Sequence, residues 1–295
     1  MKLDLHVSRF DWAGGPTAIG PGVADLARRA ETIGVTTLSF MDHFFQMDWM
    51  APATDPMLEG YTALGFVAGC TTRLRLRLLV TGVTYRHPGL LAKTVTTLDV
   101  VSGGRAELGI GAAWYEREHR GLGVPFPATA ERFERMEEAI EICFQMWRGD
   151  ESGFQGKHYQ LAETICSPMP VSQPRPRLLI GGSGERKTLR LVAKYADVCN
   201  IIVGSRDELA HKIGVLAGHC EDLGRDINEI EITTMYRDIA PDATVDDVVR
   251  GAEELAELGV STLVTGAMGS DPGQWLESTF GPAMERIAEI EPKRF

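Results

Sequence analysis

Eight short apolar segments alternate with eight longer amphipathic segments along this chain, and the alternation constrains the fold more than any other feature. Strands that alternate with helices are typical of parallel α/β sheets, and eight such units are typical of a (β/α)₈ barrel. The strands are predicted at residues 3–7, 37–41, 76–83, 106–110, 178–180, 198–203, 229–235 and 262–264. The helices are predicted at residues 23–33, 60–70, 90–98, 130–147, 185–195, 207–223, 245–258 and 274–290.

The clearest helix is Ala130–Trp147, where apolar residues recur at spacings of three and four and so form one buried face. An irregular stretch with four prolines, Gly149–Arg177, follows this fourth helix. Its length predicts an excursion over a mouth of the barrel. No linker rich in proline, glycine or serine divides the chain. We therefore predict the α/β class, as a single (β/α)₈ TIM barrel domain over residues 1–295 with an excursion after helix 4.

The charge and the cysteines exclude several classes of partner. Lysine and arginine total 30 against 41 aspartates and glutamates, a formal net charge of −11. Nucleic acid is not expected as a partner, because phosphate binding needs clustered basic residues. The five cysteines are scattered and form no C-x-x-C, and no paired histidines occur, so neither a disulfide framework nor a metal site is predicted. With no signal-like start and no apolar run near the ~20 residues of a membrane span, we expect a cytoplasmic protein without membrane contact.

Polar and aromatic residues follow several predicted strands, at the end of a barrel where catalytic groups lie. Asp42-His43 follows the second strand, and an imidazole there can act as a general acid or base. The alternative is a structural histidine in a loop. Aromatic side chains in the same loops predict a wall for a flat apolar ligand, although they could also be ordinary core. These are Trp12, Phe44, Trp49, Trp114 and Tyr115.

A glycine-rich turn, Gly181-Gly182-Ser183-Gly184, joins the fifth strand to the next helix. Backbone N–H groups at such a turn can bind a phosphate, and the Ser183 hydroxyl adds a donor. The alternative is a tight turn that binds nothing. The turn is neither a P-loop nor a nucleophile elbow, because Glu185 stands where those motifs need other residues. Gly109-Ile110-Gly111 lacks the third glycine of a dinucleotide fingerprint.

Several of these segments together resemble the bacterial luciferase-like family. The similar blocks are Leu79–Pro88, Leu91–Asp99, Ser102–Arg105, Gly109–Glu118 and Ile180–Gly184, within a resemblance that runs from Leu3 to about Gly266. Asp42-His43-Phe44 resembles the branch of that family that uses the deazaflavin coenzyme F420 rather than FMN.

The resemblance implies a cofactor site. It implies a non-proline cis peptide at Gly82–Val83 behind the flavin-like ring, with Thr81, Gly111 and Trp114 also at the cofactor. The cofactor phosphate would lie on Gly181, Gly182, Ser183 and Gly184, with Arg186 and Lys187 nearby. Asp42 and His43 would lie at the polar edge of the ring. Trp114 stands where relatives place a catalytic glutamate, so no second acid is implied there.

We expect an oxidoreductase that transfers a hydride between coenzyme F420 and a hydrophobic small organic substrate. His43 would donate or accept the proton, and Trp12, Phe44, Trp49 and Tyr115 would line the substrate pocket. One alternative is an FMN-dependent monooxygenase that uses reduced flavin and O₂, and another is a non-catalytic flavin-binding protein. A homodimer is expected by analogy with relatives. Neither the substrate nor the direction of hydride transfer follows from the sequence.

Overall fold

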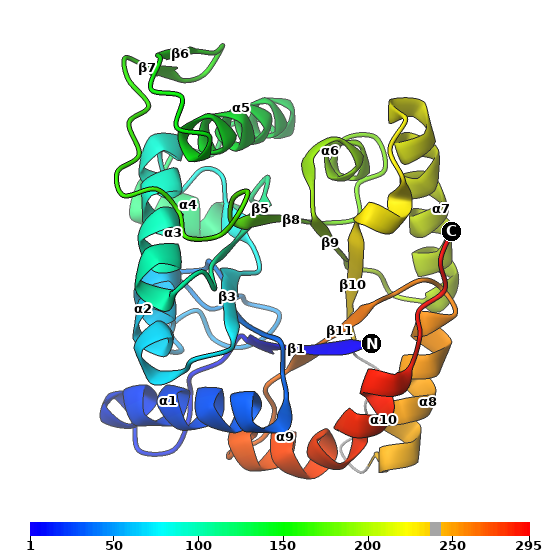
Figure 1. Cartoon of the computed structure of the whole chain (residues 1–295). Helices are drawn as coiled ribbons and strands as arrows, with labels where there is room; N and C mark the ends of the chain where they lie inside the picture. The colour runs from blue at the N-terminus through cyan, green and yellow to red at the C-terminus, as the bar shows by residue number, and fades with distance from the viewer. Residues whose placement is uncertain (237–242) are drawn as a thin grey trace.

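The structure, a computed structural model, describes residues 1–236 and 243–295, and its centre is a ring of parallel strands (Figure 1). The strands pair in the order β3-β2-β1-β11-β10-β9-β8-β5-β4, and a bridge between Leu76 and Ala106 joins the two sides of the ring. β3 and β4 are two halves of one interrupted strand, so the predicted (β/α)₈ barrel is confirmed. The strands are β1 Lys2–Val7, β2 Thr37–Phe40, β3 Arg75–Leu78, β4 Thr81–Gly82, β5 Glu107–Gly111, β8 Arg177–Gly181, β9 Val198–Ile201, β10 Glu231–Met235 and β11 Thr262–Gly266.

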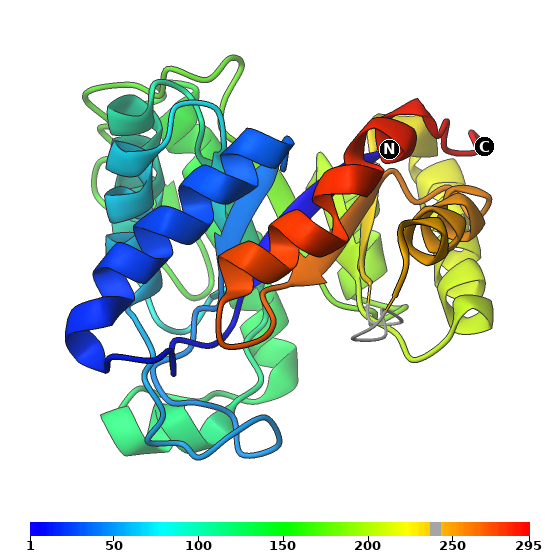
Figure 2. The ribbon, with the colours of Figure 1, turned by 90° about the horizontal axis from the view of Figure 1, so that it is seen from below.

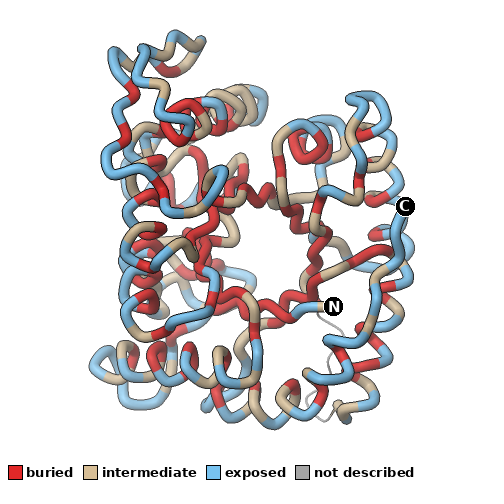
Figure 3. The backbone as a smooth tube through the Cα atoms, in the orientation of Figure 1, coloured by how far each residue is buried: buried red, intermediate tan, exposed pale blue. Residues whose placement is uncertain are grey.

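The helices surround this ring, and buried residues concentrate in the strands and on the helix sides that face them (Figure 3). α1 and α9 lie side by side along one edge of the barrel (Figure 2). No helix in the described part of the chain combines the length and apolar character needed to cross a bilayer. The larger helices are α1 Pro16–Ile33, α2 Gly60–Cys70, α3 Pro88–Ser102, α5 Thr129–Trp147, α6 Thr188–Tyr195, α7 Arg206–Leu223, α8 Val245–Ala256, α9 Pro272–Thr279 and α10 Met284–Glu289.

Three helical segments differ from the sequence-based expectation. The short helix α4, Glu116–Leu122, was not predicted, because seven mostly polar residues carry no apolar period. The helix expected from Glu185 begins only at Thr188, after a turn. The last predicted helix is divided into α9 and α10 by a 3₁₀ turn at Gly281–Ala283, which contains a proline.

The excursion after α5 lies on the outside of the barrel, so its predicted place over a mouth is wrong. It forms a small hairpin, β6 Phe154–Gln155 and β7 Gln160–Leu161. The Glu138 carboxylate of α5 accepts hydrogen bonds from backbone N–H groups in this hairpin, and Asp99 of α3 accepts two from Ser172 further along. Carboxylates on these two helices therefore hold the segment against the outer surface.

The interior of the barrel near the amino ends of the strands is filled by an ion-pair network. The Arg77 guanidinium lies 2.5 Å from Asp4 Oδ2 and 2.6 Å from Glu107 Oε2, and all three side chains are buried. Glu107 also pairs with Arg75 and Arg177 at the rim. A buried guanidinium needs such partners, because an unpaired charge in the interior is strongly destabilising. The network closes this end of the barrel and leaves the opposite end for a site.

Candidate active site

A cavity of about 700 Å³ opens among the carboxyl ends of the barrel strands. Its wall is mainly apolar and includes several methionines, whose flexible thioethers adapt to ligands of different shape. Trp49 and Trp114, which line it, are more than half exposed. The sequence-predicted residues that line the cavity are Asp42, His43, Trp49, Gly82, Gly111, Trp114, Gly181 and Gly182.

The floor of the cavity is shaped by a bulge between β3 and β4. A cis peptide joins Leu79 and Val80, so the predicted position of this bond at Gly82–Val83 is wrong. Gly82 and Val83 keep trans geometry in regular pairing, and the Val83 N–H donates to the Gly111 carbonyl. The Val80 side chain instead occupies the space beside Gly111 and Gly181, where an added Cβ would lie 2.7 and 2.9 Å from its methyl groups. The two glycines therefore make room for Val80 in the cavity wall.

His43 is held by a carboxylate that sequence analysis did not single out as a site residue. Its Nδ1 lies 2.7 Å from Oε1 of Glu118, which comes from the unpredicted helix α4 and is fully buried. Figure 2 shows α4 beside the segment that follows β2, at one end of the barrel. The backbone N–H groups of Phe44 and Phe45 donate to Glu118 Oε2 at 2.8 and 3.1 Å. The imidazole thus has Nδ1 fixed on Glu118, and Nε2 is left for a ligand.

The donors around Glu118 keep it ionised. Burial raises the pKa of this carboxyl, but the hydrogen bonds from His43, Tyr85 and the Phe44 N–H outweigh burial, and the pKa lies below its usual value. A charged carboxylate can accept the His43 Nδ1–H and stabilise an imidazolium. The pair is therefore suited to proton transfer at Nε2.

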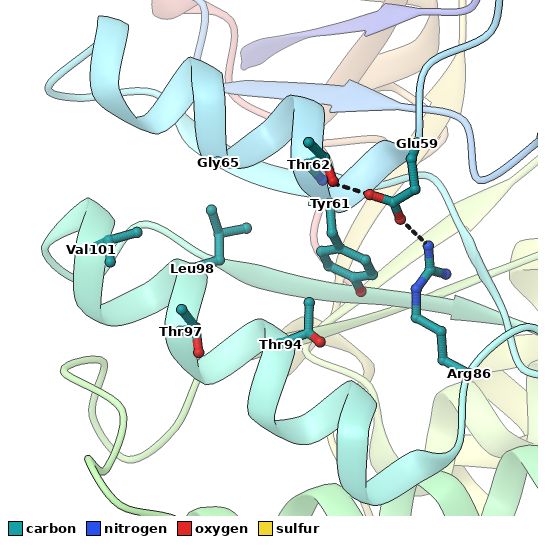
Figure 4. A pocket seen from close by; sticks show the side chains of 9 residues that line it. All are labelled: Glu59, Tyr61, Thr62, Gly65, Arg86, Thr94, Thr97, Leu98 and Val101. Atoms are coloured by element: carbon teal, nitrogen blue, oxygen red, sulfur yellow. Dashed lines mark hydrogen bonds and ion pairs between the residues drawn. The ribbon is translucent and has the colours of Figure 1, made fainter.

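Asp42 is fixed at the edge of the cavity by neighbours on two elements. Its Oδ2 accepts from the Gly82 N–H at 3.0 Å and from Arg86 at 2.7 Å. Arg86 continues to Glu59 in a second pocket between α2 and α3, where Glu59 also caps α2 through the Thr62 N–H (Figure 4). Burial raises the pKa of Asp42 even against these donors. Its Oδ1 is buried and has no hydrogen-bond partner, so it can accept a bond from a ligand.

Two further polar side chains of the cavity wall, His6 and Asn200, were not predicted. The Ser39 hydroxyl donates to the Leu5 carbonyl, so it accepts a hydrogen bond from His6 Nδ1–H at 3.0 Å. Burial lowers the pKa of His6 to about 4, which keeps the ring neutral and leaves Nε2 as an acceptor. Asn200 donates to Thr233, but its Oδ1 is buried without a partner. The wall therefore offers two more acceptors.

Arg132 of α5 supplies a positive charge to the same wall. Its guanidinium donates to the carbonyls of Ala112 and Pro127 and to the Thr129 hydroxyl, and it lies 4.2 Å from the centre of the Phe126 ring. Within residues 1–236 and 243–295, each hydrogen bond of this guanidinium goes to a neutral group. An almost buried cation held only by neutral groups can bind an anion. No simple sequence signal marks it, because Arg132 stands in an ordinary amphipathic helix.

The glycine-rich turn reaches the cavity only in part. Gly181 and Gly182 line it together with Thr188, the first residue of α6, but Ser183 and Gly184 do not. The Gly182 N–H donates to the Asn200 carbonyl, and the Ser183 hydroxyl donates to the carbonyl of Ile202. These donors are thus used within the protein. Arg186 and Lys187 are exposed beyond the turn.

The other predicted residues lie behind the wall or away from it. Thr81 is buried and bonds Tyr61, and Val83 belongs to the core. Trp12 lies against Gly22 of α1, where an added Cβ would lie 2.7 Å from its ring. Phe44 packs edge-on against Tyr85. The Tyr115 hydroxyl donates to Asp48 at 3.0 Å, which directs it away from the cavity.

The family described as luciferase-like monooxygenase matches residues 10–286, and the chain belongs to this family. An F420-dependent glucose-6-phosphate dehydrogenase of Kineococcus radiotolerans is 35% identical over 201 residues, which cover 66% of this chain and 53% of that one. An FMNH₂-dependent dimethylsulfone monooxygenase of Pseudomonas putida is 28% identical, over 65% of this chain and 54% of that one.

Among solved structures, an F420-dependent secondary alcohol dehydrogenase in complex with an F420-acetone adduct has the same fold. Its TM-score is 0.77 at 17% sequence identity, and the match covers 99% of both chains. The family match confirms the resemblance to the luciferase-like family, and the structural match agrees with the predicted barrel. Relatives that use F420 and relatives that use FMN both occur, so the comparisons leave the cofactor of this chain open.

Proposed function

We propose that this protein is an oxidoreductase that uses coenzyme F420 to exchange a hydride with an uncharged, mainly apolar organic substrate. The observation that carries the proposal is the His43–Glu118 pair at a cavity of about 700 Å³. A hydride exchange at an alcohol, imine or activated alkene also moves a proton, and this pair can donate or accept it.

The residues of the cavity fit a flat polar ring with an anionic tail. Val80, seated beside Gly111 and Gly181, offers an apolar surface on which a ring can lie. The unpartnered oxygen of Asp42 would accept a hydrogen bond from the polar edge of that ring. Arg132 and the Thr129 hydroxyl would hold the phosphate. When bound, F420 supplies the ring carbon that gives or takes the hydride.

His43 would hold the proton at Nε2. The Nδ1–H bond to Glu118 fixes the tautomer and the orientation of the imidazole, so that Nε2 faces a ligand in the right protonation state. Glu118 would stay ionised and stabilise the imidazolium that forms when His43 takes a proton. The exposed Trp49 and Trp114 rings at the cavity would cover the substrate and reduce its contact with water.

The composition of the wall also supports the substrate class. Among the described residues that line the cavity, Arg132 is the one lysine or arginine, and Asp42 is the one carboxylate. If Arg132 holds the tail of the cofactor, no described cation of the wall remains for a phosphorylated substrate. The remaining lining residues are uncharged or histidine and include several methionine and aromatic side chains, which favours an uncharged apolar molecule.

Equilibrium binding tests this proposal. The purified protein is titrated with F420 and, separately, with FMN, and tryptophan quenching is followed, because Trp49 and Trp114 lie at the cavity. We expect saturable quenching by F420 and weaker binding of FMN. Tight binding of FMN together with absent binding of F420 would contradict the proposal and favour a flavin-dependent monooxygenase.

A further inference from the structure

We propose that Tyr85 is a positioning residue that tunes the proton affinity of His43 by sharing one carboxylate oxygen with it. The Tyr85 hydroxyl donates to Oε1 of Glu118, and the same oxygen accepts the hydrogen bond of His43 Nδ1–H. A second donor withdraws electron density from that oxygen, so the imidazolium form of His43 is stabilised less than by a singly bonded carboxylate. This inference rests on the proposed role of His43 as the proton carrier.

The tautomer of His119 directs the Tyr85 proton to Glu118. His119 Nδ1 lies 2.7 Å from the Tyr115 carbonyl, which can only accept, so this nitrogen carries a hydrogen. His119 Nε2 is then the acceptor for the Thr84 hydroxyl at 2.6 Å. Both nitrogens of His119 are thus engaged, and the Tyr85 hydroxyl, 3.3 Å from Nδ1, keeps Glu118 as its acceptor.

Packing fixes the Tyr85 ring in this position. His119 stacks on the ring with 4.4 Å between centroids, and Phe44 packs against it edge-on at 5.2 Å. On the remaining side lies Gly82, where an added Cβ would be 2.7 Å from the ring. A ring held on three sides cannot turn its hydroxyl away without displacing neighbours. Gly82, predicted as a cofactor contact, therefore also makes room for Tyr85.

The other titratable groups that the structure describes near His43 and Glu118 do not donate to the carboxylate oxygen that Tyr85 shares with His43. Asp42 lies near Tyr85 but is paired with Arg86, so their charges largely cancel. His6 is near His43 on the β1 side and is neutral. Tyr115 packs edge-on against the His43 ring at 5.7 Å, but its hydroxyl donates to Asp48. Of these groups, Tyr85 alone shares an oxygen with His43 Nδ1–H.

Tyr85→Phe tests the proposal, with Tyr115→Phe as the matched control. Both changes remove one hydroxyl from a ring near His43, but only the first removes a donor to Glu118. The ligand-free protein is labelled with ¹⁵N-histidine and titrated by NMR, and the His43 signal is assigned by its loss in His43→Ala. In Tyr85→Phe we expect the midpoint of this signal to move up by about 0.5–1 pH unit. In Tyr115→Phe it should stay in place.

A second substitution, which strengthens the hydrogen-bond donor at position 85 instead of removing it, distinguishes the proposed effect from a defect in folding. Difluorotyrosine at position 85 keeps the ring and is a stronger donor, so the midpoint should move below that of the unmodified protein. With F420 and substrate, the midpoint of kcat against pH should follow the same order, whichever way the hydride moves. Equal NMR midpoints in the unmodified protein, in Tyr85→Phe and in the difluorotyrosine protein would overturn the proposal. Absence of F420 turnover would contradict the proposed function, while the NMR comparison, made without cofactor, would still decide the role of Tyr85.

Discussion

At the scale of single residues, the cavity separates groups that move protons from groups that bind charge. His43 lines the cavity and is hydrogen-bonded to a buried carboxylate. Arg132, on α5, also lines the cavity but is hydrogen-bonded to neutral groups. Catalysis and binding are distinguishable when one variant lowers turnover and another lowers affinity. Substitution of His43 should therefore lower turnover, whereas substitution of Arg132 should lower the affinity for the cofactor.

For His43→Ala we expect F420 to bind with little change while kcat falls by about 10²-fold or more, because a general acid–base group is lost. His211→Ala is the control, since that histidine is exposed on α7. Steady-state kinetics and fluorescence titration measure both quantities. Unchanged turnover in His43→Ala would remove His43 from the mechanism.

Arg132→Met should show the reverse pattern. Loss of a charge-assisted hydrogen bond to the anionic tail costs about 1.5–3 kcal/mol, which corresponds to roughly 10- to 100-fold weaker F420 binding. With saturating cofactor, kcat should recover to near its normal value. If affinity for F420 stays the same, another group binds the tail.

At the scale of elements, glycines permit the close approach of β3, β5 and β8 around the bulge. An added Cβ at Gly109 of β5 would lie 2.0 Å from the Leu78 carbonyl oxygen, an atom of the backbone that cannot turn away. Gly111 and Gly181 leave space for Val80 on the cavity side. The absence of side chains at these glycines thus permits the observed positions of β3 and of the bulge beside β5 and β8.

Gly109→Ala should lower the free energy of unfolding by about 1–3 kcal/mol, because an overpacked strand must shift. Gly65→Ala is the control, since nothing lies within 4 Å of a Cβ there and the residue is exposed on α2. That change should raise stability by up to about 1 kcal/mol, because alanine favours helix. Urea unfolding followed by circular dichroism compares the two, and equal stabilities would contradict the packing argument.

The elements were predictable where their pattern is periodic, and the site was predictable where a residue directly follows a strand. The eight barrel strands were predicted in this way, and Asp42-His43 was predicted from its place after the second strand. Glu118 and Arg132 do not, because each reaches the cavity from a helix through tertiary packing. The place of the cis bond at Leu79–Val80 was not predictable from the sequence either. Val80 fills the space beside Gly111 and Gly181, and that space is formed by three strands together.

At the scale of the whole molecule, the two ends of the barrel have different tasks. The amino ends of the strands carry ion pairs and the carboxyl ends carry the cavity, which is the division expected of this fold. Glu231 belongs to the first end and accepts from Lys2, Arg177 and Thr262. Burial opposes its ionisation, but these partners outweigh burial and lower the pKa of Glu231 to about 2.

Because the folded-state pKa of Glu231 is depressed, its stabilisation is present above about pH 4.5 and is lost as the pH falls toward 2. Glu231→Gln should therefore be less stable than the unmodified protein at pH 6, by up to about 3 kcal/mol, and nearly equal to it near pH 2. Glu291→Gln, in the exposed C-terminal segment, is the control. Urea unfolding across this range would contradict the account if the difference did not shrink with acid.

The central claim is hydride exchange with F420, and conversion in the strict absence of O₂ tests it most directly. The protein is incubated anaerobically either with oxidised F420 and a panel of secondary alcohols, or with reduced F420 and a panel of cyclic enones and imines. The F420 absorbance is followed together with the product. The account predicts conversion without O₂, with one F420 changed for each substrate molecule. Conversion only with reduced FMN and O₂ would contradict it.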